Sequence, residues 1–167
     1  MRFSAAIGKP DGDTHNAQDV WLLCAAGSFL YALPLAHVVE VMPVLRIEPV
    51  AGSPPCVRGL AVIRGTPTPV VDVALLFGGG PDGPAQRLVT VRTGLRTIAL
   101  AVDRVLGVRS FKVDETAEPL PPLLREVASD MVSAIGRLDS ELLLFLGTAR
   151  VVPDALLAHH DGREPIP

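Results

Sequence analysis

Aromatic residues, cysteines and net charge are all scarce in this sequence, and each shortage excludes a class of protein. Aromatics make up 4% of the 167 residues, so the core must be built from Val, Leu, Ile and Ala. Cys24 and Cys56 are too few for a disulfide framework and lie in apolar runs, which predicts reduced core residues. A net charge of −3 gives no bulk attraction to nucleic acid or to an anionic membrane surface.

Long apolar segments are also missing. No apolar stretch reaches the roughly 18 residues that a membrane helix needs, so we expect no direct membrane insertion. The first 20 residues carry Lys9, Asp11, Asp13 and Asp19 instead of the apolar centre of a secretory signal, which predicts a cytoplasmic protein. The apolar fraction is nevertheless 49%, enough to bury the core of a globular domain.

Catalytic motifs are absent as well. There is no phosphate-binding G-x-x-x-x-G-K-[ST] loop and no G-x-S-x-G nucleophile elbow. The stretch "GGGPDG" has dinucleotide-type glycine spacing, but it follows a predicted helix and precedes a strand, the reverse of the order that this site needs. The tail histidines His159 and His160 have no nearby cysteine. We therefore expect no catalytic residues, no cofactor and no metal; a small hydrolase that pairs His37 with Cys24 or Cys56 is a remote alternative.

The sequence does contain an internal repeat. "VWLLCAA" and "FLYALPL" flank a turn at Gly27, and "RLVTVRT" and "LRTIALAV" flank a turn at Gly94, 67 residues later. At the same spacing Val38 falls on Val105 and Val41 on Val108. "CVRGLAVIRGTPTPVVDVALLF" and "MVSAIGRLDSELLLFLGTARVV" both predict strand, polar turn, strand and short helix. Many short strands separated by Gly and Pro favour small closed barrels, because closure removes exposed sheet edges.

These patterns divide the chain into three parts. Residues 1–18 are mostly polar or small and predict a flexible N-terminal arm, and residues 158–167 predict a flexible tail. Between them we expect one domain over residues 19–157, made of barrel-like units at about 19–80 and 86–155. Whether these two units exchange strands is left open by the sequence.

Three segments resemble the CheW-like coupling proteins of bacterial chemotaxis. "YALPLAHVVEV" is similar to the opening motif of that family, "PPCVRGLAVIRGTPTPVVDVALLFG" to its L-R-G and P-V-x-D segment, and "ALAVDRVLGV" to its V-D-x-V segment. They occur in the family's order and spacing, and the resemblance covers roughly residues 19 to 155.

The resemblance implies a mainly β fold of two SH3-like five-stranded barrels packed together, with short helices. It also implies a non-enzymatic scaffold that binds the cytoplasmic tip of a chemoreceptor and the regulatory domain of a CheA-type histidine kinase. Recruitment to membrane receptor arrays would then go through these partners. The alternative is an interaction domain of the same fold in a divergent receptor–kinase pathway outside motility.

The sequence departs from the family pattern in places. Val62 and Ile63 replace the Asn and Leu that usually precede Arg-Gly, and Gly147 stands where Asp is usual before the last helix. The loss of that Asp predicts a weaker N-cap. Asp72, by contrast, is predicted to cap the helix "VALLFG".

Arg64 is the first candidate for a partner-binding residue. It lies with Gly65 at a predicted turn, and Pro67 and Pro69 begin the next strand at positions that need no backbone donor. Three roles remain open from the sequence: a solvated turn arginine, an ion pair with Glu40, or an interface anchor. The resemblance favours the anchor.

Glu40 is the second candidate, because it is the single charge in "VVEVMPVL" and points opposite to its neighbours on a strand. It is either an ordinary surface residue or, as the resemblance implies, part of an assembly contact. The resemblance ties four further positions to receptor contact, although the valines among them could equally be core: Val38, Gly59, Val105 and Val108.

Overall fold

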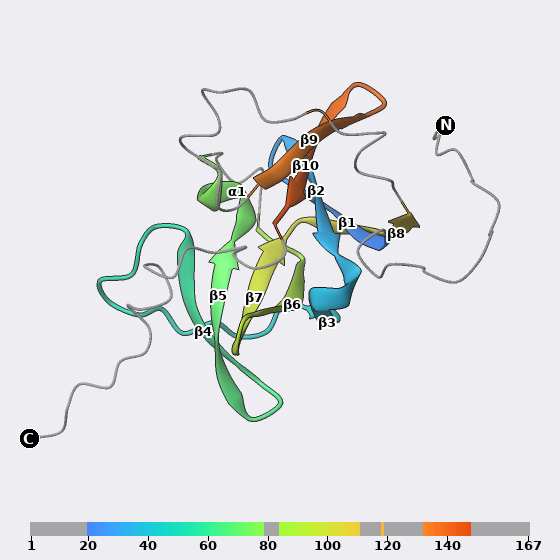
Figure 1. Cartoon of the computed structure of the whole chain (residues 1–167). Coiled ribbons are helices and arrows are strands. Elements are labelled where there is room, and N and C mark those ends of the chain that lie inside the picture. The colour runs from blue at the N-terminus through green and yellow to red at the C-terminus, as the bar shows by residue number, and fades with distance from the viewer. Residues whose placement is uncertain (1–19, 79–83, 111–117, 119–131, 148–167) are drawn as a thin grey trace, which may run out of the picture.

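The computed structural model describes residues 20–78, 84–110, 118 and 132–147. The expected arm at 1–18 and tail at 158–167 lie outside these residues. The described chain is mainly β, as predicted, with ten strands in two five-stranded sheets, one short α-helix and one 3-10 helix (Figure 1). Within the described part, no helix has the length and apolar character needed to span a membrane.

The first sheet has the strand order β8-β1-β2-β10-β9. Its strands are β8 (Arg104–Ser110), β1 (Val20–Ala26), β2 (Phe29–Pro34), β10 (Glu141–Leu146) and β9 (Val132–Leu138). The second sheet has the order β3-β6-β7-β5-β4. Its strands are β3 (Val38–Pro43), β6 (Arg87–Thr93), β7 (Arg96–Val102), β5 (Thr66–Asp72) and β4 (Val57–Ile63). The helix α1 (Val73–Leu76) follows β5, and the 3-10 helix η2 (Leu35–His37) precedes β3.

The sheets do not coincide with the sequence units 19–80 and 86–155. After β2, η2 carries the chain out of the first sheet, and β3 joins β6 in the second. After β7, the chain returns at Asp103, and β8 pairs with β1 in the first sheet. Asp103 makes two hydrogen bonds to the β1–β2 hairpin. Its backbone N–H donates to Ala25 O at 2.9 Å, and its carboxylate accepts the Gly27 N–H at 3.0 Å. Each sheet thus takes strands from both units: β1 and β2 join β8, β9 and β10 in the first, and β3, β4 and β5 join β6 and β7 in the second. β3 and β8 are outer strands of these mixed sheets.

The sequence repeat is reproduced in the backbone. The turn glycines Gly27 and Gly94 have φ values of 57° and 64°. The pairing of β3 with β6 shifts register between Val38 and Glu40, and the pairing of β8 with β1 shifts at the corresponding place. Arg64 and Asp139, at the tips of the β4–β5 and β9–β10 hairpins, are the two described non-glycine residues with positive φ, at 49° and 54°. The similar patterns in the sequence therefore form similar structures.

Apolar side chains fill three clusters, which explains why several strands are apolar on both faces. The shared core takes one face of each sheet and includes Leu22, Tyr31, Val89 and Leu100. A second cluster lies on the other face of the first sheet, where Trp21 and Phe145 meet edge-to-face with ring centroids 5.1 Å apart. The third cluster, on the other face of the second sheet, is small and made largely of Ala, Val and Leu side chains. This gives each SH3-like subdomain its own interior and places a common core between the two.

Candidate functional site

Glu40 and Arg64 form a two-pronged ion pair on the second sheet. Arg64 Nε donates to Glu40 Oε1 at 3.0 Å, and Arg64 Nη2 donates to Glu40 Oε2 at 2.7 Å. Glu40 comes from β3 and Arg64 from the tip of the β4–β5 hairpin. The Arg64 side chain is 80% exposed and that of Glu40 only 23%. Of the roles open from the sequence, the ion pair is present, and it holds an exposed guanidinium in one orientation.

The backbone supports the same placement. Glu40 N–H donates to Thr90 Oγ1 at 3.1 Å, which fixes β3 at this position against β6. Arg64 and Gly65 both have positive φ, at 49° and 78°, so the hairpin turns sharply at this point. The hydrogen bonds from Arg64 lower the pKa of the Glu40 carboxyl, and the same contact raises the pKa of Arg64. Both groups therefore remain charged over the physiological pH range.

The valines of β3 lie next to the shared core and are partly exposed. Val38 pairs with Val91 and Val41 with Val89, and both partners belong to the shared core. Directly paired residues on neighbouring strands point to the same face of a sheet. Val38 packs partly against this core, whereas Val41 stays 42% exposed. Val41 is an exposed residue that the sequence analysis used for the repeat but did not include among the candidate binding residues.

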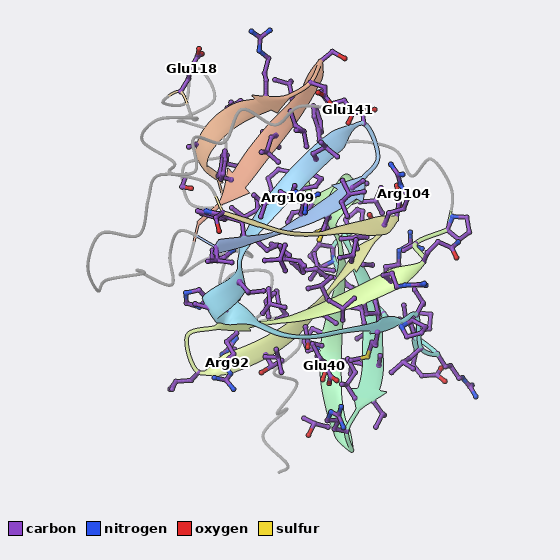
Figure 2. The ribbon with its side chains drawn as sticks, turned by 90° about the vertical axis from the view of Figure 1, so that its right-hand side faces the viewer. Glu40, Arg92, Arg104, Arg109, Glu118 and Glu141 are labelled. Carbon is purple, nitrogen blue, oxygen red and sulfur yellow. The ribbon has the colours of Figure 1, made fainter. Side chains whose placement is uncertain are left out.

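The valines of β8 occupy the equivalent positions in the first sheet. Val105 pairs with Cys24 and Val108 with Leu22, which also belong to the shared core. Val105 packs partly against this core, and Val108 is 45% exposed. We call Val38 and Val41 of β3 together with Val105 and Val108 of β8 the valine face. Figure 2 shows β8 and β3 on the side turned to the viewer, with Glu40 labelled on β3.

The backbone structure explains why residue 59 is a glycine. Its φ is 138°, and a Cβ at this position would lie 2.0 Å from the Glu48 carbonyl oxygen. Leu60, which follows Gly59, exchanges two backbone hydrogen bonds of 2.8 and 2.9 Å with Glu48. The glycine lets the segment carrying Glu48 approach the outer edge of β4, which accounts for Gly59 without a partner contact.

Asp72 caps α1, as predicted, by accepting the Leu75 N–H at 3.1 Å. The same buried carboxylate also accepts hydrogen bonds from Arg58, one of them from Nε at 2.8 Å. Sequence reasoning missed Arg58. The available signal was a lone charge inside the apolar run "CVRGLAV", because a charge in such a run needs a partner.

The residues considered for hydrolase chemistry lie in unsuitable surroundings. Cys24 is fully buried in β1, and burial raises the pKa of its thiol to about 12. Burial also raises the pKa of the Cys56 thiol. Both remain protonated near neutral pH, whereas a cysteine nucleophile must be a thiolate. In the described part of the chain, no three His, Cys, Asp or Glu side chains are placed to hold a metal ion.

Comparison with known proteins places this geometry in a family. The model of the CheW-like domain matches residues 20–155. The chain is 21% identical over 164 residues to the chemotaxis protein CheW of Klebsiella aerogenes, covering 97% of each chain. It is 31% identical over 99 residues to the protein PilI of Pseudomonas aeruginosa, covering 58% of this chain and 56% of PilI. It is 31% identical over 100 residues to the protein FrzA of Myxococcus xanthus, covering 59% and 61%.

A solved structure agrees in fold. The crystal structure of the scaffolding protein TtCheW from Thermoanaerobacter tengcongensis matches with a TM-score of 0.66 and 24% identity. The match covers 78% of this chain and 89% of TtCheW. It supports the arrangement of two SH3-like subdomains described above.

Proposed function

Because the chain belongs to the CheW-like domain family, whose members are non-enzymatic scaffold proteins, we propose that it couples chemoreceptors to a CheA-type histidine kinase in chemotaxis signalling. The observation that carries the proposal is the valine face. It places half-exposed apolar side chains on the outer strand of each sheet, where a partner can bury them.

The valine face is the proposed receptor site. Its two halves come from equivalent positions of the repeat, and each adjoins the shared core. A coiled-coil receptor tip has apolar side chains along its helices, and such a ridge can pack against two valine pairs. Burial of exposed valines would then supply the main driving force for binding.

The Glu40–Arg64 pair is the proposed kinase site. The carboxylate holds the guanidinium by Nε and Nη2, so the remaining donors of Arg64 point outward with little loss of side-chain entropy on binding. An exposed arginine held in this way is typical of an interface anchor. The protein would act in the cytoplasm and reach receptor arrays through its partners.

A second candidate function rests on the curated relatives. Identity to PilI and FrzA is 31%, compared with 21% to the chemotaxis protein CheW, although over shorter segments. These matches support, as the alternative, an interaction domain of the same fold in a receptor–kinase pathway other than the main chemotaxis system. The same surfaces would bind a different receptor and kinase.

Separate substitutions on the two surfaces test the proposal. Purified wild-type protein, Arg64→Ala, Arg64→Lys and Val108→Asp are titrated against a receptor-tip fragment and against the kinase regulatory domain from the same genome. We expect Arg64→Ala to lose roughly thirtyfold in affinity for the kinase domain, a cost of about 2 kcal/mol, and Arg64→Lys to recover part of it. Val108→Asp should weaken receptor binding alone. Affinities for both partners within about threefold of wild type for all three variants would refute the assignment.

A further inference from the structure

The tip of the β4–β5 hairpin exposes apolar side chains next to Arg64. Val62 is 64% exposed, although it lies in β4 between the buried residues Ala61 and Ile63. It pairs across the hairpin with Pro67, which is also exposed. The two side chains lie on one face of the hairpin, and each is two residues from the turn at Arg64 and Gly65.

The fold does not require an apolar residue at this position. The β9–β10 hairpin has a turn of the same length, with Asp139 at the place of Arg64 and also at a positive φ. There the pair equivalent to Val62 and Pro67 is Arg137 and Leu142. A charged side chain therefore fits this position in the same hairpin, and the exposed Val62 needs a reason other than folding.

Among the described residues, none pairs with the outer edge of β4 beside Val62. Leu60 uses its N–H and C=O on this edge to bind Glu48. Backbone groups along a strand alternate in direction, so those of Val62 point the same way, past the pair formed by Glu48 and Leu60. Pro67, the residue opposite on β5, has no N–H to donate. The Val62 backbone thus offers one donor and one acceptor to an added strand.

We propose that the β4–β5 tip is a specificity-determining part of the kinase contact, with Val62 at its centre. This rests on the proposed function, because the surface is continuous with Arg64. Val62 and Pro67 provide the apolar contact, and the Val62 backbone pairs with an extended strand of the kinase regulatory domain. Arg64 stands at the border of this contact, held by Glu40.

The ion pair sets the chemistry of the partner. Glu40 neutralises Arg64 and accepts one N–H from Nε and one from Nη2, which leaves the two N–H groups of Nη1 and the second N–H of Nη2 to donate outward. The partner therefore needs an apolar side chain and a neutral acceptor such as a backbone carbonyl, and not a net negative charge. Binding at this tip should depend only weakly on salt concentration.

The test compares Val62→Asn with a matched control, Leu95→Asn. Leu95 is also an exposed apolar residue, fully exposed at the tip of the β6–β7 hairpin. Full-length variants are titrated by calorimetry against the purified kinase regulatory domain at 50 and 300 mM salt, and melting curves are recorded. We expect Val62→Asn to lose roughly tenfold in affinity at both salt concentrations with an unchanged melting temperature. Leu95→Asn should match wild type in both measurements.

Receptor binding separates this inference from the proposed function. Val62→Asn should bind the receptor-tip fragment as wild type does. If wild type binds the kinase domain and Val62→Asn stays within twofold of it, or if Leu95→Asn loses as much, the inference is overturned and the proposed function stands. If wild-type protein does not bind the kinase domain, both are overturned.

Discussion

Replacing Gly59 by alanine separates a structural role from a contact role at one of the candidate residues. The added Cβ would lie 2.0 Å from the Glu48 oxygen and 2.9 Å from the Pro49 Cα, both backbone atoms that cannot rotate away. The segment must move outward, which breaks the two hydrogen bonds between Glu48 and Leu60. The φ of 138° is also unfavourable for any residue with a side chain.

We expect the single added methyl group to lower the free energy of unfolding by a large amount. Overpacking costs about 1–3 kcal/mol, the unfavourable φ about 1–3, and each broken hydrogen bond about 1. Because these effects relieve one another as the segment shifts, we expect a total of about 3–5 kcal/mol. At about 2–4 °C per kcal/mol for a chain of this size, the melting temperature should fall by about 10 °C or more.

The assay is thermal unfolding followed by circular dichroism, with Gly65→Ala as control. Gly65 also has positive φ, at 78°, but a Cβ there would meet nothing within 4 Å. Gly65→Ala should therefore be destabilised only by the unfavourable backbone conformation. We expect a loss of about 1 kcal/mol in the free energy of unfolding, or a few degrees in melting temperature. A Gly59→Ala protein that melts within 2 °C of wild type but loses receptor binding would refute the structural explanation.

Three further predictions concern charged and buried groups. Asp72→Ala removes the helix cap and leaves Arg58 without its carboxylate, so the urea-derived free energy of unfolding should fall by about 2–3 kcal/mol; an equal loss in Asp72→Asn would contradict the cap. The pKa of Glu40 is lowered in the folded state, so its stabilisation is present above the unfolded value of about 4.3 and is lost as pH falls through the folded value. The melting-temperature difference between wild type and Glu40→Gln should therefore shrink below pH 4, and a constant difference would contradict this. Cys24 should resist iodoacetamide at pH 8 in a Cys56→Ser background until the protein unfolds, and rapid labelling of native protein would show that the thiol is accessible.

The strands were predictable because their residues carry local signals. The segment "RLVTVRT" is β6 and "VWLLCAA" is β1, each ending at a turn glycine. Asp72 was predictable as a cap because it directly precedes the helix that it caps. Such features depend on neighbours in the sequence, and sequence patterns report those well.

The strand exchange and the partner of Arg58 were not predictable in the same way. β3 has one outward and one inward face whichever sheet it joins, so its pattern of exposed and half-buried residues does not identify the sheet. Arg58 and Asp72 meet only because β4 and β5 pair in one register, and that register comes from the fold. Glu40 and Arg64 were named as a possible pair, but their 24-residue separation gave no geometry.

The strand exchange also affects the order in which the chain can fold on the ribosome. The second sheet uses only residues 38–102, an uninterrupted segment that can pair as soon as it has emerged. The β1–β2 hairpin is made first but must wait for β8, β9 and β10, the last described strands to be synthesised. Until then, Trp21 and its apolar neighbours lack Phe145 and Leu143 as packing partners. During synthesis the first hairpin thus keeps its apolar surface exposed until these last strands are made, a condition that favours aggregation and chaperone binding.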